Sequence, residues 1–469
     1  VVLFSSITFL YAFLPAVLFF YFIAADKYRN AILLISSIIF YAWGEPKYLL
    51  VMLCIIFANY LAALQLQKAK KIKHIILIGT ICLNLCILGY FKYFNFFVEN
   101  LNNILNLKIS IINIVMPLGI SFYTFQALSY VIDVYRGEVK AQKDLRKVAL
   151  YIALFPQLIA GPIVKYHDIE QSICNKRVIT SALFVEGIKR FLCGLGKKVL
   201  IANNMGLVAD KIFNMAPEQV DTPLAWIGAI CYSLQIFFDF SGYSDMAIGL
   251  GLLFGFRFQE NFNYPYIADS ITEFWHRWHI SLSTWLKNYL YIPLGGNRKG
   301  LAQTCMNLLI VFAVTGFWHG AEWTFIAWGL WHGLFIVIEK VTGWHKKRGN
   351  AVFITFKHVL TLFIVLIGWV LFRSKDLNSA YHYLKNMFGL LPHSNEIFYT
   401  HTFYYDNIQI MAALFGILFS TPLIAKFFNR GESSELVKFC QNLSLIAIMI
   451  LSSAFLTADT YNPFIYFRF

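Results

Sequence analysis

The sequence predicts an all-α polytopic membrane protein, and three observations indicate this class: composition, hydropathy and the recurrence of long apolar stretches. Of the 469 residues, 58% are hydrophobic and 14% are charged, whereas a water-soluble chain carries about 25% charged residues. The mean hydropathy is +0.61. The excess apolar surface must therefore face lipid. This composition excludes a secreted enzyme, a soluble nucleic-acid-binding domain and a disordered scaffold.

Apolar stretches recur along the whole chain. A span needs about 20 apolar residues, so we expect about eleven spans. Pieces that are shorter, or broken by Gly or Pro, predict re-entrant or half-membrane helices, which a bilayer tolerates only where protein or a water-filled cavity satisfies the backbone. They indicate a central funnel or tunnel. The candidate stretches are 1–23, 31–43, 49–66, 75–97, 110–132, 148–164, 183–210, 224–256, 304–318, 323–341, 353–373, 408–427 and 439–457.

The first stretch and the charges indicate how the chain is inserted. Residues 1–24 lack a basic leader and a small-residue cleavage site, so we expect a retained span instead of a signal peptide. The net charge is +14, and in membrane proteins Lys and Arg collect in cytoplasmic loops. We therefore place the basic cluster at 68–73 in the cytoplasm and expect no nucleic-acid partner. Without repeats or linkers, residues 1–469 are predicted to form a single domain.

The eight cysteines lie mostly inside apolar runs and lack paired metal-ligand spacing. They are typical of small buried hydrophobic residues. We expect neither a disulfide framework nor a metal site.

Ionisable residues within apolar sequence gather between positions 239 and 333. Such groups are costly at membrane depth and mark a substrate path or a reaction site. The clearest is His319, which follows the apolar run 308–318. Gly316 and Gly320 flank it and allow a backbone or a ligand to come close. The alternative is a histidine that ends a helix and only bonds a carbonyl group.

Two further histidines lie in a segment rich in tryptophan. His276 and His279 are three residues apart, so on a helix they would share one face, with Arg277 pointing elsewhere. A helix with this content can equally lie at the headgroup boundary. His332 follows in an aromatic context that favours packing or a supporting role.

Asp239 and Asp245 flank a predicted Ser-Gly-Tyr-Ser turn inside an apolar run. An unpaired carboxylate is expensive there. The two residues either orient a histidine or pair with an arginine, or they cap a broken helix. Both interpretations stay open.

Several motifs together carry a family resemblance. They are Asp-Phe-Ser-Gly-Tyr-Ser-Asp at 239–245, the run 274–298, Trp-His-Gly at 318–320, Pro-Leu-Gly-Ile-Ser-Phe-Tyr-Thr-Phe at 117–125, Phe-Pro-Gln-Leu-Ile-Ala-Gly-Pro at 155–162 and Asn-Pro-Phe-Ile-Tyr-Phe-Arg-Phe at 462–469. In their order along a polytopic chain, they closely resemble the membrane-bound O-acyltransferase family, nearest to its alginate and peptidoglycan O-acetyltransferase branch. The likeness covers essentially the whole chain.

The resemblance implies a fold and an activity. The fold is a ring of tilted helices around a thinned centre. The activity moves an acetyl group from a cytoplasmic thioester, with acetyl-CoA as donor substrate and no permanently bound cofactor. The family's invariant histidine matches His319, and its second important histidine matches His279. We expect Asp239, Asp245, His276, Trp318 and His332 to line the tunnel or support the catalytic residues.

The resemblance also implies an acceptor, partners and a location. The acceptor is a hydroxyl of a cell-wall or extracellular polysaccharide, with peptidoglycan favoured over alginate or another exopolysaccharide. An extracytoplasmic transferase of the SGNH-hydrolase type would receive the acetyl group. The expected place is the bacterial cytoplasmic (inner) membrane, where lipids surround a multi-pass protein.

The residue types suit this chemistry. Histidine has an ordinary pKa of about 6.5, so it can accept a proton from a hydroxyl and return it to a thiolate. The oxyanion needs donors, and backbone amides at 316–320 or an imidazolium at His279 are candidates. The phosphates of coenzyme A need cations, and Arg277, Lys287 and Arg298 are candidates by charge. Each can equally be an ordinary interface residue.

Three alternatives stay open. One is D-alanyl-type transfer to teichoic acid. Another is a transporter or flippase without acyl chemistry, whose ionisable residues line a path. The third is a membrane iron oxygenase, because imidazole suits iron, although only 276 and 279 have close spacing.

Overall fold

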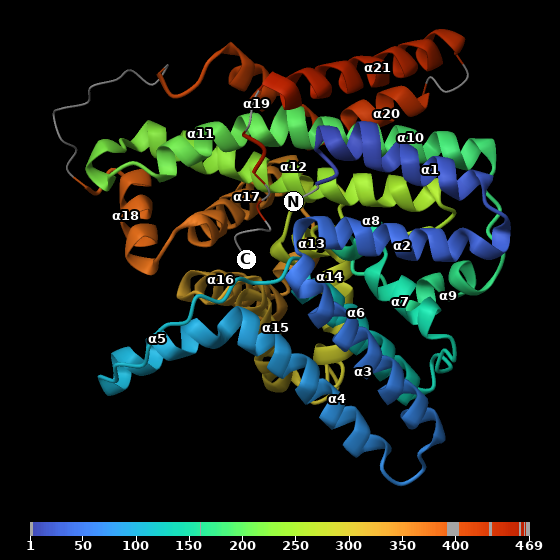
Figure 1. Ribbon diagram of the computed structural model, residues 1–469. Coiled ribbons are helices and arrows are strands. Elements are labelled where there is room, and N and C mark those ends of the chain that lie inside the picture. Colours follow the sequence, from blue (N-terminus) through green and yellow to red (C-terminus); the bar gives the residue numbers. More distant parts are fainter. Residues whose placement is uncertain are drawn as a thin grey trace. The chain divides into compact units, whose positions relative to one another are not determined.

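The computed structural model describes residues 3–159, 161–391, 403–430, 434–458, 461–463 and 465. Every regular element in these ranges is a helix (Figure 1), which confirms the all-α prediction. The chain divides into two compact units, Val1–Phe191 with Tyr243–Gln259, and Leu192–Gly242 with Glu260–Phe469. The single-domain assignment stays a prediction. Within the predicted motifs, residues 160, 464 and 466–469 lie outside the described residues.

Helices that can cross a membrane occur throughout the described residues. Seven helical stretches there are long and apolar enough, which confirms a multi-pass membrane protein. Two shorter apolar helices, Phe9–Ile23 and Asn407–Phe419, accompany them. The total of about eleven spans stays a prediction. The seven are Pro46–Lys68, Lys73–Leu105, Thr222–Leu253, Leu301–His319, Trp323–Thr342, Ala351–Arg373 and Glu435–Ala458.

In the first unit, α3, α4 and α6 pack on one another (Figure 1). Buried Asn59 and Asn84 exchange amide hydrogen bonds of 3.0 and 3.1 Å between α3 and α4, which satisfies both polar groups in apolar surroundings. The loop between these helices carries the basic cluster. The helices of this unit are α1 (Leu14–Ile23), α2 (Asp26–Gly44), α3 (Leu49–Lys68), α4 (Lys73–Leu88), α5 (Phe94–Leu105), α6 (Ile120–Arg136), α7 (Leu145–Ala153), α8 (Phe155–Leu158) and α9 (Tyr166–Cys174).

Two predicted spans of this unit differ in the structure. The stretch 148–164 is broken into the end of α7 and the short α8, as the Pro and Gly residues indicated. For the stretch 110–132 the predicted start of the span is wrong, because α6 begins only at Ile120. Gly119 has a φ of 70°, a left-handed conformation that favours glycine, and it separates the preceding segment from the helix.

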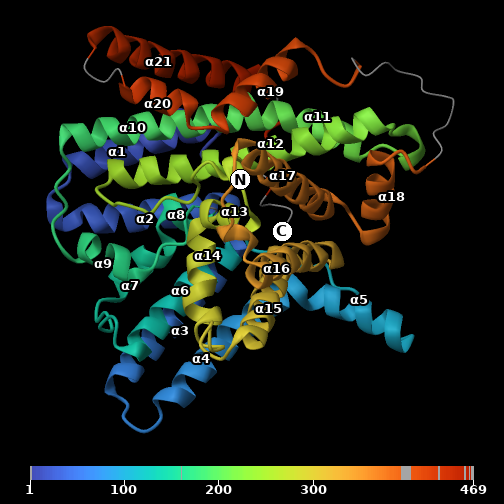
Figure 2. The same ribbon diagram turned by 180° about the vertical axis from the view of Figure 1, so that it is seen from behind.

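The second unit holds the predicted site. Its α15 and α16 run side by side in both views (Figure 2). Glycines allow this, since a Cβ at Gly316 would lie 2.2 Å from the Phe325 carbonyl oxygen, and one at Gly329 would lie 2.2 Å from that of Phe312. The helices are α11 (Asn203–Phe213), α13 (Ile271–Arg277), α14 (Ile280–Leu286), α15 (Leu301–His319), α16 (Trp323–Thr342), α17 (Ala351–Arg373), α18 (Leu377–Met387), α19 (Asn407–Phe419), α20 (Leu423–Arg430) and α21 (Glu435–Ala458).

Two helices, α10 (Ser181–Gly196) and α12 (Thr222–Leu253), contribute residues to both units. The predicted Ser-Gly-Tyr-Ser turn is wrong, because 239–245 is continuous helix within α12. Gly242 serves close packing instead: a Cβ there would lie 2.8 Å from the Gly194 carbonyl oxygen. The helix-cap interpretation of Asp239 and Asp245 is therefore wrong as well.

Candidate active site

His319 is the last residue of α15, and its ring lies in an aromatic cage. The residue is 4% exposed. Its ring centroid lies 5.0 Å from that of Trp318, 5.1 Å from that of Trp328 and 5.3 Å from that of Phe372. The following Gly320 has extended backbone, and its missing side chain leaves room for the ring of Phe325. At both flanking glycines, the group that comes close is therefore part of the protein itself: the Phe325 backbone at Gly316 and the Phe325 ring at Gly320.

A small cavity, here called the His319 cavity, adjoins this ring. Its open volume is about 10 Å³, which is room for one water molecule. The wall is apolar apart from the imidazole and three indole groups, so a charge that develops there is poorly screened. The lining residues are Ile236, Phe240, Trp278, His319, Trp328, Trp369, Phe372 and Ile465.

Residues 316–320 lie at the C-terminal end of α15, and this position decides whether their backbone amides can serve as oxyanion donors. A helix presents unpaired carbonyl groups at its C-terminal end, and its N–H groups there are already bonded within the helix. Gly320 follows this pattern, with its N–H donating to the Gly316 carbonyl at 3.4 Å. The expectation that amides at 316–320 serve as oxyanion donors is therefore wrong.

His279 is fully buried between α13 and α14. Its Nδ1 lies 3.1 Å from the Asn261 Oδ1, and the same oxygen accepts the Ser281 N–H at 3.2 Å. The oxygen can only accept, so Nδ1 carries the proton and Nε2 keeps a lone pair. Burial lowers the pKa of His279 below its ordinary value, because the charged form is disfavoured away from water. A neutral ring is thus favoured over an imidazolium.

Both candidate catalytic histidines contact Trp318. The ring centroids of His279 and Trp318 are 6.3 Å apart, and Trp318 adjoins His319. His279 also packs edge-on against Phe240 at 4.6 Å, and Phe240 lines the His319 cavity. The structure therefore brings His279, Trp318 and His319 into one cluster, with His279 behind the cavity wall.

The expectation that His276 and His279 share a helix face is wrong. Helix α13 ends at Arg277, and Trp278 has extended backbone. His279 has a φ of 44°, which is uncommon for a residue with a side chain and costs about 1–3 kcal/mol. Consequently His276 is exposed on α13 while His279 is buried.

His332 lies on α16 and packs among aromatic rings. It stacks on Phe274, with ring centroids 6.0 Å apart and an interplanar angle of 11°, and it contacts Trp275 edge-on at 5.4 Å. Neither ring nitrogen has a hydrogen-bond partner among the described residues. This placement fits packing better than proton transfer.

Asp239 forms a buried ion pair with Lys198, at 2.7 Å, and the two side chains are 2% and 1% exposed. Its other oxygen accepts the Ile465 N–H at 2.9 Å, and the Lys198 ammonium donates to the Pro463 carbonyl. The pair therefore fixes the segment that brings Ile465 to the His319 cavity. Sequence reasoning missed Lys198, although a lysine inside the apolar stretch 183–210 was a visible signal.

Asp245 pairs with Arg190, at 2.6 Å, in the first unit. This agrees with the arginine-pairing interpretation of Asp245. For Asp239 the cationic partner is a lysine instead of an arginine. A role of Asp245 in a substrate tunnel stays a prediction.

The three candidate phosphate-binding cations have different surroundings. Arg277 is paired with Glu273 at 2.7 Å and donates to the Asn263 carbonyl, so its guanidinium is already engaged. Arg298 is exposed just before α15. Lys287 is exposed and lines a pocket beside α14.

This second pocket, here called the α14–α15 pocket, has a volume of about 350 Å³. That volume lies in the range of small-molecule sites. The pocket combines apolar walls with cationic and hydroxyl-bearing side chains. The lining residues are Thr272, Trp275, His276, Ile280, Leu282, Ser283, Thr284, Leu286, Lys287, Tyr291, Leu308, Val311, Phe312, Thr315 and Ile336.

Comparison with known proteins finds one matching family model and several proteins of similar sequence. The model of the membrane-bound O-acyltransferase family matches residues 142–374. The chain is 46% identical to a protein of Pseudomonas aeruginosa named probable alginate O-acetylase, over 82% of this chain and 75% of the relative. It is 40% identical to the protein of that name in Pseudomonas putida, over 99% and 100%. It is 34% identical to a peptidoglycan O-acetyltransferase of Helicobacter pylori, over 100% and 98%.

Proposed function

Because this chain belongs to the membrane-bound O-acyltransferase family and is thus an acyltransferase, we propose that it passes an acetyl group from a cytoplasmic thioester to a hydroxyl acceptor across the membrane. The family resemblance found in the motifs is confirmed. The observation that carries the proposal is the buried His319 at the end of α15, open to a water-sized cavity.

His319 acts as the general base in this proposal. The acceptor oxygen attacks the thioester carbonyl carbon while the imidazole takes the hydroxyl proton. The tetrahedral intermediate then collapses, the C–S bond breaks, and the imidazolium returns the proton to the leaving thiolate. A positioned base of this kind contributes about 10²- to 10⁴-fold to the rate.

The oxyanion of that intermediate needs a hydrogen-bond donor in the cavity. Trp328 lines the cavity, and its buried indole N–H has no acceptor among the described residues. An indole nitrogen can only donate. We assign the oxyanion contact to Trp328, with His279 and its neutral ring supporting the cage through Trp318.

The α14–α15 pocket is the donor site in this proposal. The pocket can hold the elongated arm of acetyl-CoA, and Lys287 supplies a cation for its phosphates. In the part of the chain that the structure describes, Lys287 has no ion-pair partner, unlike Arg277. The sequence expectation for Lys287 thus gains support, while that for Arg277 loses it.

The acceptor class rests on the relatives alone. By their names, they acetylate alginate and peptidoglycan, and identity is higher to the alginate relative, 46% against 34%. These identities give no support to the expectation that peptidoglycan is favoured as the acceptor. We propose that the acceptor is a hydroxyl of an extracellular or cell-wall polysaccharide. An extracytoplasmic SGNH-type partner delivers the acetyl group to it, and the chain itself lies in a bacterial inner membrane.

The base is tested with purified protein and radiolabelled acetyl-CoA. We expect His319→Ala to lose acetyl transfer by at least about 10²-fold while the protein stays folded in detergent. His382→Ala, at a histidine on α18 that does not line the His319 cavity, is the matched control. Undiminished transfer by His319→Ala would remove the proposal, and an inactive wild type that moves intact substrate would favour a transporter.

The donor site is tested by Lys287→Gln. Loss of a phosphate contact weakens donor binding, so we expect KM for acetyl-CoA to rise about 10-fold, as for the loss of about 1.4 kcal/mol, with kcat little changed. Lys340→Gln, an exposed lysine on α16, serves as control. An unchanged KM in the Lys287 variant would exclude this residue from donor binding.

A further inference from the structure

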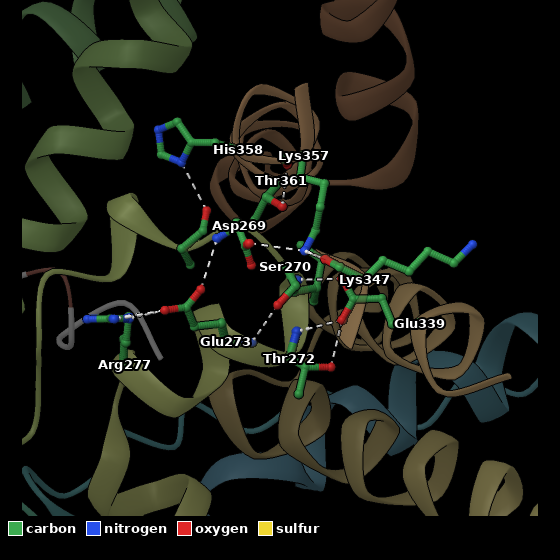
Figure 3. Close-up of polar contacts among 12 residues, drawn as sticks. Asp269, Ser270, Thr272, Glu273, Arg277, Glu339, Lys347, Lys357, His358 and Thr361 are labelled. Carbon is green, nitrogen blue, oxygen red and sulfur yellow. Dashed lines mark hydrogen bonds and ion pairs between the residues drawn. The ribbon is translucent and has the colours of Figure 1, made fainter. Parts of the chain in front are cut away.

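The helix that leads to His279 is held at its first turn by a carboxylate from another helix. Glu339 of α16 is 5% exposed, and it accepts the backbone N–H groups of Ile271 at 2.6 Å and Thr272 at 2.8 Å (Figure 3). The Thr272 hydroxyl donates to it as well, at 2.6 Å. First-turn N–H groups have no partner inside their own helix, and negative charge is favourable beside them. Glu339 therefore fixes the start of α13 to α16.

The segment just before α13 is fixed to α17. Lys357 of α17 is 1% exposed and pairs with Asp269 at 3.0 Å, and its ammonium also donates to the Lys347 carbonyl at 3.2 Å. The next residue, His358, donates from Nδ1 to the Ala268 carbonyl at 3.0 Å. Figure 3 shows Asp269 and Lys357 pointing toward each other. The start of α13 is thus held from two helices at once.

The C-terminal end of α13 leads directly into the candidate active site. The helix has seven residues and is therefore about 10 Å long. Trp278, which follows it, lines the His319 cavity, and His279 comes next. Midway, Phe274 stacks on His332. A shift or tilt at the first turn is consequently transmitted to Trp278 and His279.

The two helices that hold α13 also supply other walls of the cavity. Helix α16 contributes Trp328, and α17 contributes Trp369 and Phe372. One polar network therefore fixes three wall-forming elements relative to one another. Glu339 itself lines neither the His319 cavity nor the α14–α15 pocket, so its effect on the reaction is indirect.

We propose that Glu339 is a positioning residue for acyl transfer, because its carboxylate sets the place of α13 and thereby aligns Trp278 and His279 with the cavity. The inference rests on the proposed function. A displacement of about 1 Å caused far from the reacting atoms can lower a rate by about 10²-fold. In Glu339→Gln, the amide NH₂ group would face backbone N–H groups, two donors toward each other, at unchanged side-chain size.

The test compares Glu339→Gln with Glu218→Gln, an exposed glutamate outside the network. We expect Glu339→Gln to lower kcat per folded molecule by about 10- to 100-fold. The control should match wild type. A purely structural role would lower the folded fraction and leave kcat per folded molecule unchanged, and that result would overturn the inference.

A second readout does not depend on activity. Hydrogen exchange over residues 271–286 should be faster in Glu339→Gln than in Glu218→Gln, because the first turn of α13 has lost its acceptor. Equal exchange would overturn the inference. An inactive wild type with this exchange difference would refute the proposed function and leave the anchoring intact. If Glu339→Gln does not fold, Thr272→Val, which removes one of the three bonds to Glu339, should speed hydrogen exchange over residues 271–286 by a smaller amount, and unchanged exchange would overturn the inference.

Discussion

At the scale of single residues, local sequence singled out the candidate base but not its surroundings. His319 was recognisable because an imidazole follows an apolar run between two glycines, and the structure buries it beside a cavity. Lys198 was missed, although the aspartate that it pairs with was singled out. This pair joins residues 41 positions apart in sequence, so only the fold reveals which opposite charges meet.

One residue prediction concerns the indole donor. Trp328→Phe keeps a ring in the cage and removes its N–H group. We expect kcat to fall by about 10²-fold, the usual cost of losing one oxyanion donor, with little change in KM. Steady-state kinetics with acetyl-CoA measures this. The control is Trp331→Phe on the same helix, whose N–H donates to the Ile364 carbonyl; equal rates in the two variants would contradict the assignment.

At the scale of elements, the length of the apolar stretches predicted most of the long helices, and the errors came from tertiary packing. The motif 239–245 looked like a turn because Ser and Gly favour turns. In α12 the same Gly242 admits a neighbouring backbone, so the glycine reflects close packing. The helix break after Arg277 was missed because the run 274–283 has no Gly or Pro that would signal it. The left-handed residue there is His279, which gives no such signal.

An element prediction follows from the contact of α15 with α16. In Gly316→Ala, the new Cβ would lie 2.2 Å from a backbone oxygen, so the helices must separate. We expect a loss of about 1–3 kcal/mol in stability, together with reduced transfer, because His319 ends α15. Thermal unfolding in detergent measures the loss.

Gly79→Ala is the matched control. It lies in α4, where an added Cβ meets nothing within 4 Å, and alanine is the better helix former by about 1 kcal/mol. Its melting temperature should equal or exceed that of wild type. An equal response of both variants would mean that the close approach at Gly316 does not matter for stability.

At the scale of the whole molecule, composition predicted the membrane class and the motifs predicted the family, and both are confirmed. The number of spans was less accessible, because short helices such as α7, α8, α13 and α14 interrupt the hydropathy pattern. Their stability depends on neighbouring protein, and the sequence of one segment does not encode those neighbours.

The most direct test of the central claim uses sealed vesicles that contain the purified protein in one orientation. Radiolabelled acetyl-CoA is supplied on the side of the 68–73 loop, and a hydroxyl acceptor is enclosed on the other side. We predict that the label reaches the enclosed acceptor with wild-type protein and does not with His319→Ala. Equal labelling by the two proteins, or labelling only of acceptor placed on the donor side, would contradict transfer across the membrane through His319.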